Sequence, residues 1–218
     1  MDYFFTFAEI VGTVAFALSG ALKAIQKNLD IFGVCTLAVF TALGGGVLRD
    51  LLLGLTPPRM FYSEGYLLTA IGVAVATFLV VRWFHQATDF GLWWDRVFNV
   101  CDALGLGIFA VIGTQAAIRA GFGEKFFLCL FTGMITGVGG GVLRDMMCVE
   151  IPSILRKHIY AVAALAGSLL YYVLVRWVLP AVSATAVAVA VTVTLRVLAR
   201  HYQWNLPKAI KQEKTSLK

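Results

Sequence analysis

Seven long apolar segments constrain this chain more than any other feature of its sequence. Each holds at most one charged residue, and each is long enough to cross a hydrocarbon core about 30 Å thick, which takes roughly 20 helical residues. They cover residues 3–22, 31–48, 65–81, 97–118, 126–143, 159–175 and 177–195. A bundle of buried soluble helices is the alternative, but it would have to hide every face of seven helices. The sequence therefore predicts an all-α membrane protein with seven transmembrane helices.

The composition agrees with a membrane protein. Of the 218 residues, 60% are hydrophobic and 14% are charged, whereas a soluble domain averages about 25% charged residues. Mean hydropathy is +0.83. The net charge of +6 comes from basic residues between and after the apolar segments, a distribution typical of membrane topology and contact with lipid headgroups. We therefore expect membrane lipids as partners and no nucleic acid.

The basic residues between the segments predict an orientation. With the N-terminus outside, the inner side receives Lys23, Lys27, Arg82, Arg96, Arg156, Lys157, Arg196, Arg200, Lys208, Lys211, Lys214 and Lys218. The outer side receives Arg59, Arg119, Lys125 and Arg176. The positive-inside rule then puts the N-terminus outside and the C-terminus in the cytoplasm. Residues 202–218 are expected to form a partly disordered cytoplasmic tail.

An internal repeat divides the chain. Residues 44–50 and 139–145 both read Gly-Gly-Gly-Val-Leu-Arg-Asp, and Glu9 aligns with Asp102 in flanking stretches that share glycines and a Phe-Ala pair. Further matches pair Pro57 with Pro152, Tyr66 with Tyr160 and Arg82-Trp83 with Arg176-Trp177. The predicted units are residues 1–88 and 89–178, each with three spans, followed by a seventh helix at 179–201 and the tail. Because three is odd, the second unit is expected to be inverted in the membrane.

The glycine triplets predict irregular second and fifth helices. Three adjacent glycines weaken a helix and point in directions roughly 100° apart, so they cannot all serve one packing face. We expect a break or kink at each triplet, with freed backbone groups lining a polar path. The alternative is that the glycines let helices cross closely. The candidate pore-lining residues are Gly44, Gly45, Gly46, Gly139, Gly140, Gly141, Thr41 and Thr136. The two threonine hydroxyls either join this path or bond back to their own helix.

Charged residues in apolar segments are functional candidates because they are costly in lipid. Adjacent residues of a helix point to different sides, so Arg49 and Asp50 are expected to be poor partners for each other. The expected pairs are Arg49 with Asp145, Arg144 with Asp50, or either arginine with Glu9 or Asp102. These six residues are candidates for gating or for ion pairs between the repeats. Snorkelling of the arginines to an interface, combined with structural pairing, is the alternative.

No enzyme signature is present. The sequence has no HExxH, GxSxG or phosphate-binding loop, and its three histidines fall singly in connections or the tail. The four cysteines lack CxxC spacing, so neither a disulfide framework nor a zinc site is indicated. We expect no cofactor and no bound metal.

Two three-helix repeats with GGGxxRD on the second helix of each, followed by a seventh helix, resemble the prokaryotic trimeric intracellular cation (TRIC) channel family. The resemblance covers roughly residues 3–201. It implies a homotrimer in which each protomer holds its own pore, lined by kinked helices 2 and 5 at the glycine triplets. Monovalent cations, chiefly K⁺ and also Na⁺, would pass through it. The same bacterial sequence family includes members described as glycine transporters, so a secondary transporter of a small zwitterion is the alternative. A membrane scaffold is a third and weaker one.

Overall fold

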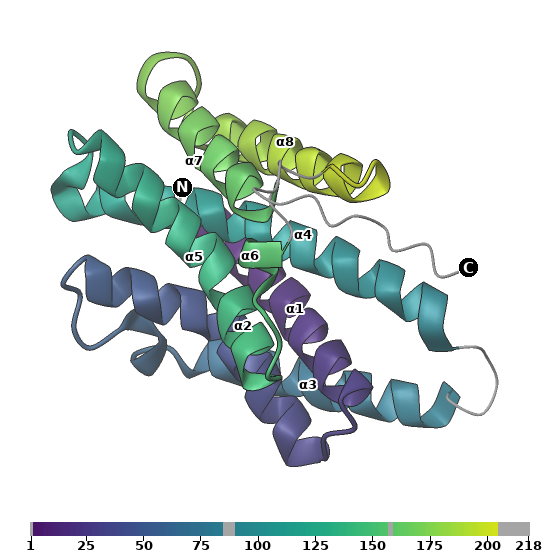
Figure 1. Ribbon diagram of the computed structural model, residues 1–218. Helices are drawn as coiled ribbons and strands as arrows, with labels where there is room; N and C mark the ends of the chain where they lie inside the picture. The colour runs from purple at the N-terminus through teal and green to yellow at the C-terminus, as the bar shows by residue number, and fades with distance from the viewer. Residues whose placement is uncertain (1, 85–89, 157–158, 205–218) are drawn as a thin grey trace.

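The computed structural model describes residues 2–84, 90–156 and 159–204. Within these ranges the chain is helical and has no strand. The elements are α1 (Asp2–Gln26), α2 (Ile31–Leu52), a 3₁₀ turn η1 (Arg59–Phe61), α3 (Glu64–Phe84), α4 (Phe90–Ala117), a π-helical turn η2 (Ile118–Phe122), α5 (Phe126–Met147), α6 (Ser153–Arg156), α7 (Ile159–Trp177) and α8 (Ala181–His201) (Figure 1). Seven of these helices are long and apolar enough to cross a membrane. The prediction of an all-α protein with seven spans is confirmed.

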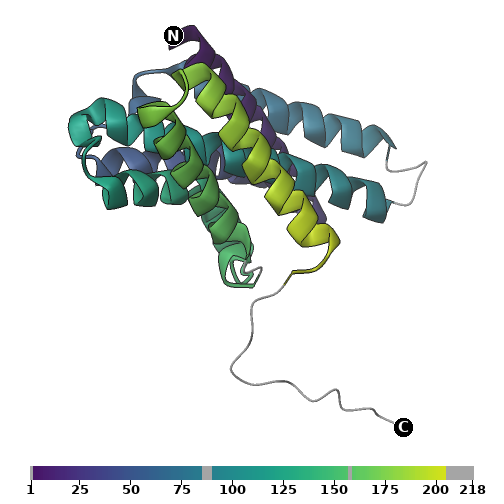
Figure 2. The ribbon, with the colours of Figure 1, turned by 90° about the horizontal axis from the view of Figure 1, so that it is seen from above.

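The boundary between the last two long helices differs from the sequence expectation. The last apolar segment of the sequence starts at residue 177. In the structure, however, Trp177 is the last residue of α7, and α8 begins at Ala181, after Pro180. Proline has no backbone N–H to donate into a continuing helix but is well suited to the start of a new one. The reversal at this proline therefore lets α8 fold back against α7, and the two helices lie together on one flank (Figures 1 and 2).

The centre of the molecule is the contact of α1 with α4. The Phe16 and Phe109 rings meet there with centroids 5.4 Å apart. A Cβ added at Gly105 would overlap the Phe16 ring, and one added at Gly12 would lie about 3.1 Å from the Phe109 ring. These four residues correspond in the two sequence copies. The absence of side chains at the two glycines thus makes room for the phenyl rings between the helices.

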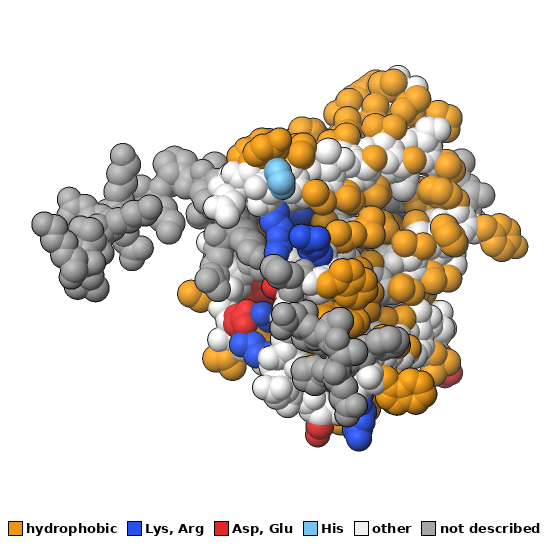
Figure 3. All heavy atoms as spheres, turned by 90° about the vertical axis from the view of Figure 1, so that its right-hand side faces the viewer, with side chains coloured by type: hydrophobic (Ala, Val, Ile, Leu, Met, Phe, Trp, Pro, Cys, Tyr) orange, Lys and Arg blue, Asp and Glu red, His pale blue; other side chains and the backbone are white. Residues whose placement is uncertain are grey.

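The outer surface is apolar over most of the spans. Large side chains such as Phe32, Leu68 and Phe127 are more than 60% exposed, and Figure 3 shows hydrophobic side chains spread over one face. Exposed apolar area on this scale marks a surface covered by another apolar phase. Together with the seven long helices, it identifies a multi-pass membrane protein.

Salt bridges tie the helices together at one end of the bundle. Glu150, which follows α5, lies 2.7 Å from both Lys23 and Lys27 at the end of α1. The pKa of Glu150 is lowered to about 2, chiefly by these two lysine hydrogen bonds. At the same end, Gln26 donates to Asp95 on α4 at 3.2 Å. The end of α1, the start of α4 and the end of α5 therefore lie on the same side of the bundle.

Candidate functional site

The glycine triplets lie where α2 crosses α5. A Cβ added at Gly45 would overlap the carbonyl oxygen of Thr136, and one added at Gly140 would overlap that of Thr41. The approach is backbone to backbone in both cases, which only glycine permits. Each contact is the counterpart of the other at a shift of 95 residues along the chain. Such reciprocal contacts are what a two-fold axis through the crossing produces.

The remaining triplet residues have other neighbours. Gly44 faces Leu143, and Gly139 faces Leu48 across the same crossing. The third glycine of each triplet points elsewhere: Gly46 faces the Arg49 guanidinium, while Gly141 faces the Tyr160 hydroxyl and the Arg144 guanidinium. Three glycines roughly 100° apart therefore do not serve a single face; they serve two.

The expected break in these helices is wrong. Both α2 and α5 continue through their triplets as single α-helices, so the triplets form no non-helical segment with freed carbonyls and amides. The alternative, glycines that allow close crossing, is what the structure has. The physical reason is that tight packing on two faces offsets the cost of the glycines. A bend that keeps the helical pattern stays a prediction.

The threonines one turn earlier are fully packed. Thr41 donates to the Leu37 carbonyl and Thr136 to the Thr132 carbonyl, each at 2.6 Å. Both side chains are at most 1% exposed. The hydroxyls thus bond to their own helices in this state, and a role in lining a pore stays a prediction.

Arg144 is the centre of a buried polar cluster in the second half of the chain. Its side chain is 0% exposed, and Nη1 donates to Asp102 Oδ1 and to Ser19 Oγ, each at 2.6 Å. Nε donates to the neighbouring Asp145 at 3.0 Å. Tyr160 donates to the same Asp102 oxygen at 3.4 Å. Arg144 is thus paired with Asp102, one of the expected partners, and does not snorkel to an interface.

The corresponding cluster in the first half is arranged differently. Arg49 Nε donates to Asp50 at 2.8 Å. Tyr66, the sequence counterpart of Tyr160, donates to Glu9 at 2.6 Å. Among the ion pairs that the structure records, neither Arg49 with Asp145 nor Arg144 with Asp50 occurs. The expectation that adjacent Arg and Asp are poor partners is wrong in both copies, because the long arginine side chain folds back to reach its neighbour.

The two aspartates of the repeated motif also hold the chain that follows. Asp50 Oδ2 accepts the Arg59 backbone N–H at 2.9 Å, at the start of η1. Asp145 Oδ2 accepts the Ser153 backbone N–H at 2.7 Å, at the start of α6. Each carboxylate thus neutralises its arginine and fixes a connection. Sequence reasoning missed this role, and it missed Tyr66, Tyr160 and Ser19, although the match between the two tyrosines could have indicated the first pair.

The first-half cluster borders a cavity. A cavity of about 520 Å³ is bounded by α1, α2, η1 and the start of α3, and Phe109 of α4 lies at one wall. It is lined by Thr6, Glu9, Thr13, Ala42, Leu43, Gly46, Arg49, Asp50, Arg59, Met60, Tyr62, Ser63, Tyr66 and Phe109. In the other cluster, Arg196 of α8 lies over the Tyr160 ring at 4.7 Å. Equivalent positions therefore differ in access: Glu9 borders a cavity, while Asp102 is 3% exposed.

Solved structures with this fold decide the family. A prokaryotic TRIC channel in 0.5 M KCl is 35% identical and covers 94% of this chain and 100% of its own, with a TM-score of 0.84. A TRIC trimeric intracellular cation channel orthologue from Rhodobacter sphaeroides is 33% identical and covers 92% and 98%, with a TM-score of 0.82. This chain belongs to the prokaryotic TRIC family.

Sequence relatives and a family model also match most of the chain. The UPF0126 inner membrane protein YadS of Escherichia coli K12 is 37% identical over 203 residues, 91% of this chain and 93% of the relative. A family model described as "Glycine transporter" matches residues 6–82 and again residues 99–176. The two matched segments fall on either side of the connection between α3 and α4. The TRIC relatives are ion channels rather than enzymes.

Proposed function

We propose that this chain is a cation channel of the bacterial inner membrane. It forms a homotrimer in which every protomer conducts K⁺, and also Na⁺, between two inverted repeats at residues 1–88 and 89–178. The N-terminus lies outside and the C-terminus in the cytoplasm. The double match of one family model supports the duplication, and the reciprocal glycine contacts support a two-fold axis. The relative from Rhodobacter sphaeroides is a trimeric intracellular cation channel orthologue, which supports both the trimer and the conduction of cations.

The cavity beside Glu9 is the observation that carries this proposal. It brings the Glu9 carboxylate and several hydroxyls into the bundle, and carboxylates attract cations into a pore. The fixed positive charge of Arg49 would oppose this, but Asp50 lies 2.8 Å from it. Arg59 lies at the exposed rim. The cavity is therefore suited to a partly dehydrated monovalent cation.

The α2–α5 crossing is the gate in this proposal. Beyond the cavity, Gly45 and Gly140 press against the opposing backbone, and the buried Arg144 cluster fills the other half. Ions pass only when the crossing loosens, so this structure is a closed state. Glycines are suited to such a gate because small shifts of two backbones in contact change the width of the gap.

A second candidate is a secondary transporter of glycine or a similar zwitterion, favoured by the description of the matching family model. The same cavity holds the Arg49 guanidinium and the Glu9 carboxylate. These groups could bind the carboxylate and ammonium of an amino acid. Its volume of about 520 Å³ lies in the range of small-molecule sites.

Reconstitution of the purified chain separates the two candidates. The channel predicts unitary currents in a planar bilayer under a KCl gradient, with a reversal potential near that of K⁺. Glu9→Gln should lower the current, whereas Glu64→Gln, at the exposed start of α3 and outside the cavity, should not. Saturable glycine uptake into liposomes without unitary currents would overturn the channel and support the transporter.

A further inference from the structure

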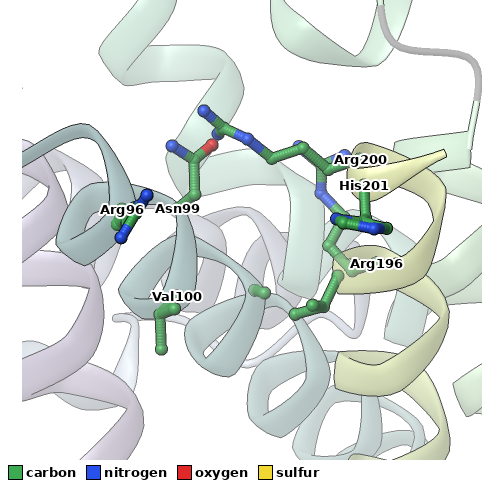
Figure 4. Close-up of a pocket in the computed structure, with 8 residues that line it drawn as sticks. Arg96, Asn99, Val100, Arg196, Arg200 and His201 are labelled. Carbon is green, nitrogen blue, oxygen red and sulfur yellow. The ribbon is translucent and has the colours of Figure 1, made fainter. Parts of the chain in front are cut away.

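A second pocket lies between the start of α4 and the end of α8. Its volume is about 390 Å³. It is lined by Arg96, Asn99, Val100, Ala103, Arg196, Val197, Arg200 and His201. Figure 4 shows the polar side chains of α4 and α8 facing one another across it, with Arg200 extended toward Asn99. None of these residues lines the cavity beside Glu9.

Positive charge gathers in this pocket; Asp95 and Asp102 act electrostatically on Arg200, but neither forms a recorded ion pair with it. Within the part of the chain that the structure describes, no carboxylate lies within salt-bridge distance of Arg96, Arg196 or Arg200. Arg196 is only 6% exposed. Its guanidinium lies over the face of the Tyr160 ring, which is a cation–π contact and not an ion pair. The nearby Asp95 accepts a hydrogen bond from Gln26. Three like charges close together repel one another, so an anion bound between them would be stabilised.

The surroundings indicate where that anion comes from. The pocket lies at the end of the bundle where α1 ends and α4 starts, the end that also carries Lys23 and Lys27. In Figure 3 a pale blue histidine and blue basic side chains border the orange apolar surface. Val100, Ala103 and Val197 add apolar walls. A soluble anion would gain nothing from such walls, whereas a lipid has both a phosphate and apolar parts.

We infer that this pocket binds the phosphate of an anionic phospholipid. Guanidinium groups donate in a planar fork that matches two phosphate oxygens, and Arg96 and Arg200 approach from opposite helices. The glycerol and first acyl carbons lie along the apolar walls. Because Arg196 also contacts Tyr160, which bonds to Asp102, the lipid site adjoins the Arg144 cluster.

Native mass spectrometry of the full-length chain in detergent tests this inference. Phosphatidylglycerol is titrated in, with phosphatidylcholine as the neutral-headgroup comparison. Each basic residue beside an anionic lipid contributes a factor of about 5 in affinity. Arg96→Gln and Arg200→Gln should therefore each weaken phosphatidylglycerol binding about 5-fold, and the double variant about 25-fold. Both side chains are exposed, so the variants should fold, which thermal unfolding checks.

Arg82→Gln is the matched control, because it removes an exposed arginine at the end of α3, outside the pocket. It should leave phosphatidylglycerol affinity unchanged. Equal losses in this control and in the pocket variants would reduce the effect to net charge and overturn the site. Inorganic phosphate and glycerol 3-phosphate form a further arm. If millimolar amounts of either displace the lipid completely, the pocket is a site for soluble phosphate and the lipid assignment fails.

Discussion

Replacement of Gly45 by alanine tests whether the α2–α5 crossing is as tight as the structure has it. The added Cβ meets the Thr136 carbonyl oxygen, which belongs to a helix backbone and cannot rotate away. The helices would have to separate locally by about 1 Å to restore ordinary contact. Overpacking of this kind costs about 1 to 3 kcal/mol, and a rigid backbone partner places Gly45→Ala near the upper end. Alanine's better helix propensity returns about 1 kcal/mol. The net loss of stability should be about 2 kcal/mol.

Gly72→Ala is the matched control for this change. Gly72 lies within α3, and an added Cβ there meets no atom within 4 Å. It should gain up to about 1 kcal/mol from helix propensity alone, so the two variants should differ by about 3 kcal/mol. Reversible unfolding in mixed detergent micelles with increasing SDS measures the difference. Gly140→Ala should behave like Gly45→Ala, because its contact is the reciprocal one. Equal stability of Gly45→Ala and Gly72→Ala would refute the reasoning.

Three further predictions concern the buried cluster and the salt bridges. Asp102→Asn should destabilise the protein by about 3 kcal/mol, since it leaves Arg144 buried without its main partner; Glu9→Gln, at the corresponding but more accessible position, should cost clearly less in the same SDS titration. Ser19→Ala should cost about 1.5 kcal/mol through one lost hydrogen bond to a buried charge, and no loss would show that the bond contributes nothing. Glu150 has a lowered pKa of about 2 against an ordinary 4.5. Its stabilising effect should therefore be fully present above about pH 4.5 and fade toward pH 2. Thermal unfolding of wild type and Glu150→Gln across this range should converge at low pH, and a constant gap would contradict the assignment.

The membrane spans could be predicted because the signal is local. Seven apolar segments are visible in the amino-acid sequence itself, and the confirmed helices start and end within a few residues of most of them. The exceptions have local causes as well. Pro180 splits the last apolar stretch, and α4 begins before its apolar segment, at Phe90. The family could also be recognised, because the seven-residue motif at 44–50 recurs unchanged at 139–145.

The role of the glycines could not be predicted, because it depends on the neighbouring helix. Nothing near Gly45 in the sequence reveals that the Thr136 carbonyl lies against it. The Arg-Asp neighbours were misjudged for a related reason. Directions of Cβ atoms on a helix say little about an arginine, whose terminal atoms are several bonds away. The pairing of Arg144 with Asp102 was among the expected alternatives, but sequence alone could not choose it.

The packing of α8 has a consequence for any current through this protein. The helix lies against α4 and α7, and its Arg196 lies over Tyr160. The first half of the chain has an open cavity at the corresponding tyrosine. A path between two equivalent halves would present the same energy profile from both sides, whereas this one would have a wide polar entrance on one side and a buried arginine on the other. Such a profile gives rectification: at equal and opposite voltages the two currents differ. Deletion of α8 would remove Arg196 from the Tyr160 ring. The currents at equal and opposite voltages would then become more nearly equal.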